Sequence, residues 1–215
     1  MTQPNAPTER TRVRRVPEHA DYRRATLLAI IDAAWLCHVA FADAKGSHCM
    51  PTACWREGDY LYVHGSNGGR LVKLLAQGAQ ACVTITHLDG LVLARSAFSH
   101  SMNYRSAMVY GVFEKVDDEM AKRASMATFM EKIAPGRQGE VRPGSVKEFD
   151  ATTILRISLA EAACKVRSGP PLDDEEDMAV AAWTGVLPMA LRQMAPVRDG
   201  QCALPDPAYV TVWAS

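Results

Sequence analysis

The sequence feature that most restricts the fold is a strand, a glycine-rich turn and a short helix between residues 59 and 78. Residues 60–63 (Y-L-Y-V) are strand formers that follow a turn at Gly58. Ser66 and Asn67 are suitable helix N-caps, and Gly78 is a suitable C-terminal stop. Three glycines between strand and helix permit close backbone approach: Gly65, Gly68 and Gly69. Three leucines at helical spacing then predict one buried helix face: Leu71, Leu74 and Leu75.

This arrangement is suited to binding a phosphate. A helix N-terminus presents free backbone N–H groups and the positive end of the helix dipole. Arg70 and Lys73 are three residues apart, which places them on one side of that helix end, and His64 and Ser66 offer further hydrogen bonds. The alternative is an ordinary strand-turn-helix whose two basic side chains are solvated, because glycine-rich turns are common.

Charge and hydropathy exclude several classes of protein. Lys and Arg together number 24, equal to Asp and Glu, so there is no basic excess of the kind that a general nucleic-acid binder needs. The sequence contains no run of about 18 apolar residues, so no transmembrane helix is predicted. The first residues lack the apolar core of a secretory signal, so we expect a cytoplasmic protein.

Cysteine spacing gives no support for a metal site. No C-x-x-C pair occurs, and the nearest approach to a ligand cluster is His48-Cys49 with Cys54. Most of the cysteines lie in apolar segments, where a free thiol behaves as a small hydrophobe. We therefore predict no bound metal. The six cysteines are Cys37, Cys49, Cys54, Cys82, Cys164 and Cys202.

The rest of the chain is typical of a mainly β (α+β) fold, a β-barrel with peripheral helices. We expect a flexible N-terminal arm at residues 1–16, one domain at 17–190 and a C-terminal tail at 191–215. Helices are predicted from Pro17 and over 118–133. The predicted strands are 35–41, 48–55, 60–63, 81–86, 91–96, 107–113, 152–159 and 162–166, with turns at 42–46 and 87–90.

Two segments have features of a binding site. Pro51 lies inside a predicted strand and implies a bulge or a missing ladder hydrogen bond, which would leave backbone groups free for a ligand. The polar residues at 100–106 lead into the strand that follows them, as in a binding site, but a loop has the same composition.

Taken together, the motifs resemble the flavin-nucleotide-binding branch of the pyridoxamine 5′-phosphate oxidase superfamily, close to the nitroimidazole-resistance proteins. The resemblance covers most of residues 17–190. The matching stretches are R-A-T-L-L-A-I-I-D (24–32), M-P-T (50–52), D-Y-L-Y-V-H-G-S (59–66), T-H-L-D-G-L-V-L-A-R-S (86–96), H-S-M-N-Y-R-S (100–106), K-V-R-S-G-P-P (165–171) and W-T-G (183–185).

The resemblance implies a split β-barrel homodimer with FMN in clefts at the subunit interface. The residues implied at the FMN phosphate are His64, Gly65, Ser66, Arg70 and Lys73. Those implied at the isoalloxazine edge, through backbone groups, are Met50, Pro51 and Thr52. A strand lining the same cleft would contribute Asn103, Tyr104, Arg105 and Ser106. Trp183 resembles a tryptophan that borders the flavin, although a large aromatic residue is also typical of a core.

His64 is the candidate catalytic residue, because it matches a histidine of the nitroimidazole-resistance proteins and could donate a proton. His100 and Tyr104 are further candidate donors, and a structural role for His64 is the alternative. The segment after Trp183 lacks the R-x-H-D-R element of the oxidases, so vitamin B6 synthesis is not expected. The leading hypothesis is an FMN-dependent oxidoreductase of a small molecule. The alternatives are a non-catalytic flavin- or haem-binding module and a deazaflavin-dependent reductase.

Overall fold

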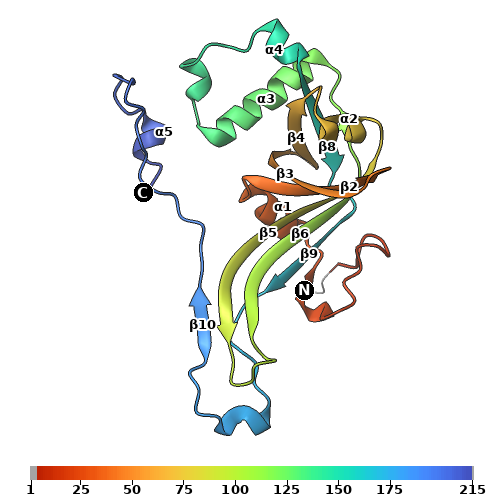
Figure 1. The fold of residues 1–215 in the computed structure, drawn as a ribbon, viewed down its shortest axis with the longest axis vertical. Coiled ribbons are helices and arrows are strands. Elements are labelled where there is room, and N and C mark those ends of the chain that lie inside the picture. The colour runs from red at the N-terminus through yellow and green to blue at the C-terminus, as the bar shows by residue number, and fades with distance from the viewer. Residues whose placement is uncertain (1–3, 215) are drawn as a thin grey trace.

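The computed structural model describes residues 4–214 and confirms the mainly β fold with peripheral helices. Within these residues, ten antiparallel strands form one continuous sheet that curls around a core (Figure 1). The strands are β1 (Ala20–Asp21), β2 (Leu36–Asp43), β3 (Gly46–Glu57), β4 (Tyr60–Ser66), β5 (Gln80–Leu93), β6 (Ser101–Val112), β7 (Glu114–Lys115), β8 (Thr152–Ser158), β9 (Ala162–Arg167) and β10 (Gly185–Pro188). The helices are α1 (Arg24–Asp32), α2 (Arg70–Ala76), α3 (Glu119–Ile133), α4 (Val146–Asp150) and α5 (Ala208–Thr211), with 3-10 turns at Pro17–His19, Arg137–Gly139 and Glu175–Ala179.

The strand order β1-β9-β6-β5-β2-β3-β4-β8-β7 divides the barrel at β3. The first part of β3 pairs with β2, and its last residues, Cys54–Glu57, pair with β4. Apolar side chains from both halves meet in the main core, to which α1 and α2 add Leu27, Ile31 and Leu75. A smaller cluster of Trp55, Tyr62 and Ile154 lies on the other face of β3, β4 and β8, under α3. Alternate residues along β3, β4 and β8 therefore contribute to two separate cores.

The helix over 119–133 and the hairpin at Asp43–Gly46 agree with the sequence predictions. The helix expected from Pro17 begins only at Arg24, after a 3-10 turn.

The predicted turn at 87–90 is wrong. β5 runs unbroken from Gln80 to Leu93 opposite β6, and the register shifts only between Leu88 and Gly90. Asp89 is thus the extra residue of a bulge in a long strand. The turn comes later, and residues 101–106, taken for a loop or a strand entrance, belong to β6.

Of the two alternatives predicted for Pro51, a bulge or a missing ladder hydrogen bond, the structure shows no bulge. The register between β2 and β3 is continuous, and Pro51 lies opposite His38. β4 pairs with β3 only from Cys54 onward, so the other side of β3 at Pro51 is an open edge. A proline is tolerated at such an edge because no neighbouring strand requires its missing N–H.

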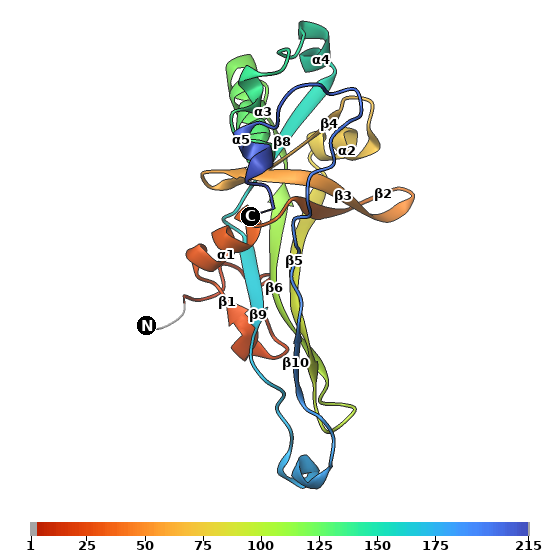
Figure 2. The same ribbon diagram turned by 90° about the vertical axis from the view of Figure 1, so that its left-hand side faces the viewer.

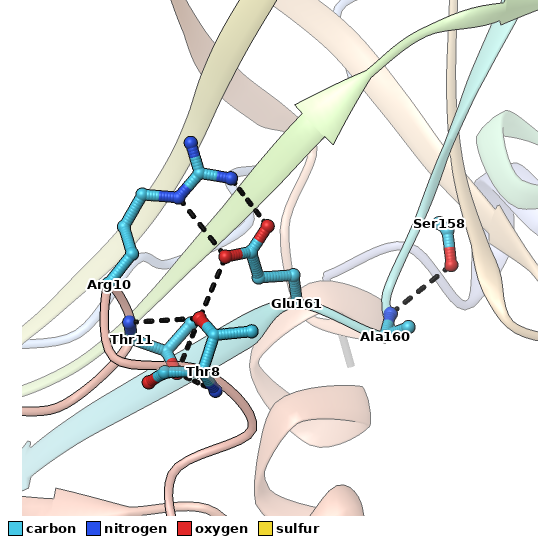
Figure 3. Close-up of polar contacts among 6 residues, drawn as sticks. All are labelled: Thr8, Arg10, Thr11, Ser158, Ala160 and Glu161. Atoms are coloured by element: carbon cyan, nitrogen blue, oxygen red, sulfur yellow. Dashed lines mark hydrogen bonds and ion pairs between the residues drawn. The ribbon is translucent and has the colours of Figure 1, made fainter.

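The N-terminal arm is held against the barrel over its described part (Figure 3). Glu161 accepts hydrogen bonds from Thr8 Oγ1 at 2.7 Å and from Arg10 Nε at 3.1 Å. The guanidinium of Arg10 also lies 4.7 Å from the ring centroid of Tyr110, and Thr11 is buried. Residues 1–3 of the predicted arm lie outside the described residues. The described contacts give the arm a defined position at the start of β9.

The β5–β6 hairpin projects from the barrel, and the chain from Gly185 onward, called the C-terminal tail from here on, runs along it (Figures 1 and 2). β10 pairs with β5 from Gly185 opposite Leu93 to Pro188 opposite Gly90. A Cβ at Gly90 would lie 2.9 Å from the carbonyl oxygen of Leu187, so only glycine permits this approach. Beyond β10 the tail returns toward α3 and ends in α5. No helix among residues 4–214 is long and apolar enough to span a membrane.

Candidate functional site

The glycine-rich turn before α2 is built differently from the sequence prediction. The N-cap of α2 is Gly69, without a side-chain cap, and not Ser66 or Asn67. Asn67 instead ties the turn to β8, where its side chain accepts a hydrogen bond from Thr153 Oγ1 at 2.7 Å. Gly65 permits α2 to pack on β4, because a Cβ there would lie 2.7 Å from Val72 Cγ2. The close backbone approach at Gly65 therefore serves the packing of α2 within the protein.

Arg70 and Lys73 project from α2, and Arg70 is engaged with the β2–β3 hairpin. Its Nη2 lies 2.5 Å from Asp43 Oδ2 and 2.7 Å from His48 Nε2. The contacts with Arg70, and then with His48, hold the pKa of Asp43 well below its usual range. Arg70 and Lys73 remain exposed, as does Ser66. An anion at this helix end would therefore meet two exposed cations: Arg70, which is paired with Asp43, and Lys73.

His64 lies on the opposite face of β4 from Val63 and Gly65. Its ring packs against Phe129 of α3, with centroids 4.9 Å apart, and against Trp55 at 5.8 Å. Its Nδ1 is buried and has no hydrogen-bond partner among the described residues. Burial lowers the pKa of His64, so the imidazole is neutral at neutral pH. The structure does not bring this residue to Arg70, and its predicted roles at the phosphate and in catalysis stay predictions.

The predicted residues on β6 form a second group. Arg105 makes two hydrogen bonds of 2.8 Å to Asp89, the bulged residue of β5, and these lower the pKa of Asp89. Asn103 is buried and donates to the carbonyl oxygen of Gly169 at 3.1 Å. Ser106 donates to the carbonyl oxygen of Lys165, and Tyr104 lies in the strand between them. The side chains of Asn103, Arg105 and Ser106 thus fix β6 to its neighbours, and Arg105 also lines a groove.

That groove lies between the sheet and the returning tail and has a volume of about 650 Å³. Its walls include Trp35, His87 and Arg105 on one side, and Met189 and Leu191 of the tail on the other. A smaller hollow of about 270 Å³ shares Trp35, His87 and Leu191 with it and continues to His38. The volume of the groove and its combination of polar and apolar walls are typical of small-molecule sites.

The remaining predicted residues lie elsewhere in the chain. Met50 and Pro51 are exposed on β3, with Thr52 half-buried beside them, and β2 and β5 separate this strand from β6. Trp183 is 64% exposed, two residues before β10, which begins opposite Leu93 at the end of β5, and its ring lies over Gly185. One chain therefore presents three separate groups: β3 with α2, β6 with its groove, and Trp183.

Sequence reasoning missed several residues of these groups. Asp43 and His48 were assigned to a turn and to a weak metal candidate, Asp89 to a turn, and the tail to no site at all. No local signal identifies them, because each acquires its role from a partner distant in the chain. For Asp89 alone the neighbouring sequence gives an indication, because a glycine within a strand, here Gly90, is typical of a bulge.

Comparison with known proteins agrees with the fold. The family model for pyridoxamine 5′-phosphate oxidase matches residues 23–166. No curated protein matches the sequence. Among solved structures, a 5-nitroimidazole antibiotic resistance protein described from Bacteroides thetaiotaomicron shares the fold, with 22% identity, a TM-score of 0.58, and coverage of 68% of this chain and 86% of that one.

Two further structures are similar over almost the whole chain. The flavocytochrome Anf3 from Azotobacter vinelandii is 42% identical, with a TM-score of 0.94 and coverage of 98% of this chain and 99% of that one. The FAD and haem binding protein from Mycobacterium smegmatis is 34% identical, with a TM-score of 0.86 and coverage of 91% and 97%. The family model and these full-length similarities lead to one conclusion: the chain belongs to the pyridoxamine 5′-phosphate oxidase family.

Proposed function

We propose that this chain is a redox protein that binds a flavin nucleotide and also holds haem. The observation that carries the proposal is its 42% identity to a flavocytochrome over 98% of the chain. The similarity includes the tail, which lies outside the family model. The second relative is described as binding both FAD and haem. The oxidoreductase and the haem-binding module that we separated at the sequence level are thereby combined in one protein.

The start of α2 fits the phosphate of a flavin. This helix has no side-chain cap and no acidic residue in its first turn, and it carries Arg70 and Lys73. Positive charge at the positive end of a helix dipole is unfavourable unless an anion binds there. Arg70 occupies that end, and Asp43 offsets part of its charge; a phosphate would offset the rest, with Lys73 in the last turn as a second cation.

The flavin in this proposal is FAD, in place of the FMN expected from the sequence, because the relative from Mycobacterium smegmatis is described with FAD. Both nucleotides carry a phosphate on the ribityl chain, so the same helix end serves either one. Bound flavin supplies electron transfer, and the protein contributes binding, orientation and electrostatics.

His64 fits a haem ligand better than it fits a proton donor. An iron ligand must be a neutral imidazole with a free nitrogen, and the buried Nδ1 of His64 has no partner among the described residues. His48, His87 and His100 each use one ring nitrogen, toward Asp43, the carbonyl oxygen of Ile30 and that of Ser96, and each keeps the other, so His64 is distinguished by its burial in an aromatic cluster. A lowered pKa makes His64 a poor acid at neutral pH.

The flavin half of the proposal is tested by the paired substitution Arg70→Ala and Lys73→Ala. The purified double variant should contain little flavin, and its affinity for FAD and FMN should fall by at least about tenfold, since each charge-assisted hydrogen bond contributes about 1.5–3 kcal/mol. Lys122→Ala on α3 is the matched control and should keep full flavin. Unchanged flavin content in the double variant would contradict the placement at α2.

The haem half is tested by His64→Ala, with His100→Ala as the control. Pyridine haemochrome assays should show that His64→Ala loses haem and keeps flavin, whereas His100→Ala keeps both. His100 lies on an exposed part of the β5–β6 hairpin and is bonded only locally, to the Ser96 carbonyl. Full haem occupancy in His64→Ala would exclude this residue as the ligand.

We also propose that the protein is a homodimer. Large apolar side chains lie exposed on the sheet, among them Leu36, Met50, Met102 and Met108. Exposed apolar surface of this kind marks an interaction site in many proteins, and a stable homodimer would bury upwards of about 2,000 Å². Light scattering should give twice the chain mass, and Met102→Lys with Met108→Lys should shift it to the single mass. A wild-type monomer with flavin bound would contradict the proposal.

A cytoplasmic location remains part of the proposal. All six cysteines are free thiols in the structure, and two of them, Cys49 and Cys202, are exposed. Unpaired exposed thiols are typical of a reducing compartment. Fractionation of the producing cells, with thiol labelling of the recovered protein, tests this: the chain should be found in the cytoplasmic fraction with reduced thiols.

A further inference from the structure

A second cleft lies between the C-terminal end of α3 and the tail and is separate from the groups described above, although Trp35 and Gln193 also border the groove. Its volume is about 620 Å³. This size falls within the range of small-molecule sites. Its apolar walls come from two sides: Trp35, Ile133 and Pro135 from the body, and Tyr209, Val210 and Trp213 from the tail.

The tail wall is held in place by specific contacts. The ring of Trp213 lies against that of Trp35, with centroids 6.2 Å apart at 53°. Tyr209 Oη donates a hydrogen bond to Glu140 at 2.6 Å and accepts one from Arg137 at 2.6 Å. These contacts join residues about 70 and about 180 positions apart, so the cleft has two fixed walls.

One charge enters the cleft. Among the residues that line it, two have ionisable side chains: Lys132, with its ammonium group, and Tyr209, with its phenol. Its Nζ donates to the carbonyl oxygen of Ala34 at 2.6 Å and lies 5.7 Å from the ring centroid of Trp35. Asp32, which acts on it electrostatically, is itself paired with Arg56 at 2.7 Å. The ammonium is half-buried, and burial lowers its pKa.

We propose that this cleft binds a planar aromatic ligand that carries one carboxylate. The ring would lie beside the contacting pair of Trp35 and Trp213 and against Ile133 and Pro135, where aromatic contact contributes beyond burial of area. The carboxylate would accept a hydrogen bond from Lys132, whose charge no carboxylate on the cleft wall neutralises. The inference goes beyond the proposed flavin and haem sites, because the residues that line the cleft include neither Arg70 and Lys73 nor His64, and it does not depend on either cofactor.

The test uses the full chain with matched cofactor content. Calorimetric titration with naphthalene-2-carboxylate should show binding at least about tenfold tighter than that of the neutral 2-naphthamide, because the hydrogen bond to Lys132 is charge-assisted. In Lys132→Met the carboxylate should lose this advantage, while the amide keeps its affinity. Trp213→Leu should weaken both probes. Lys122→Met, on the same helix but outside the cleft, is the matched control and should bind as the wild type does.

Several results would overturn the proposal. They are equal binding of the two probes to the wild type, no binding of either, or the same loss in Lys122→Met as in Lys132→Met. Probe affinity that falls as the protein concentration rises would identify the cleft as an interface between copies of the chain, and this too would overturn it. If Lys132→Met does not fold, Val210→Asp supplies the test, because a carboxylate in the wall should repel the charged probe and leave the amide unaffected.

Discussion

Gly65→Ala tests how α2, and with it the proposed phosphate site, is positioned. A Cβ at this residue would lie 2.7 Å from Val72 Cγ2, whereas carbon atoms pack at about 3.5–4.0 Å. Val72 is buried and its neighbours Leu71 and Leu75 belong to the main core, so α2 has little room to withdraw. Overpacking of this kind costs about 1–3 kcal/mol. For a protein of this size the melting temperature should then fall by about 2–12 °C.

The assay is thermal and urea unfolding of Gly65→Ala beside a glycine in open space. Gly68→Ala is that control, since its Cβ would meet only Ser66 Oγ at 3.8 Å, and its stability should change by less than about 0.5 kcal/mol. Val72→Ala should restore Gly65→Ala in part, with a favourable coupling of about 1 kcal/mol in a double-mutant cycle. Wild-type stability in Gly65→Ala, or strict additivity in the double variant, would refute the close packing.

Three further predictions follow from particular contacts. Gly90→Ala should detach β10 from β5, because its Cβ would lie 2.9 Å from the Leu187 carbonyl oxygen, and amide exchange at residues 185–188 should then rise while that of α1 does not. Glu161→Gln should loosen the N-terminal arm, seen as faster tryptic cleavage at Arg10 with an unchanged melting temperature; equal cleavage rates would contradict the role of Glu161. Because the pKa of His64 is lowered in the fold, the unfolded chain binds a proton at this residue more readily than the folded apo-protein does. Acidification from the ordinary histidine pKa of about 6.5 down to the folded value should therefore destabilise the apo-protein. His64→Phe should reduce this dependence of stability on pH. An unchanged slope in His64→Phe would assign it to other groups.

Local pattern was sufficient for most of the fold. The leucine spacing of α2, the cap at Asp118 before α3 and the positive φ of Gly78 after α2 are features that a short window of sequence contains. Errors arose where a distant segment decides the structure. The turn predicted at 87–90 is a strand with a bulge, because β6 and β10 both pair with that part of β5.

The candidate site was predictable only by type of residue. Arg70 was identified as a basic residue at a helix start, but its partners Asp43 and His48 come from a hairpin about 25 residues earlier. His64 was placed with the phosphate residues because they are adjacent in sequence, whereas strand alternation turns it to the other face, against Phe129. The groove and the second cleft depend on the returning tail, which has no helical or strand periodicity to predict its path.

The central claim is that one chain holds both a flavin and a haem at different places on the barrel. Native mass spectrometry of the purified protein tests it most directly, since it weighs the intact chain with its cofactors. We expect a species with one FAD and one haem per chain, loss of haem alone in His64→Ala and loss of flavin alone in the Arg70→Ala, Lys73→Ala variant. A wild-type protein of bare chain mass after expression with haem precursor and riboflavin supplied, or variants that lose both cofactors together, would contradict it.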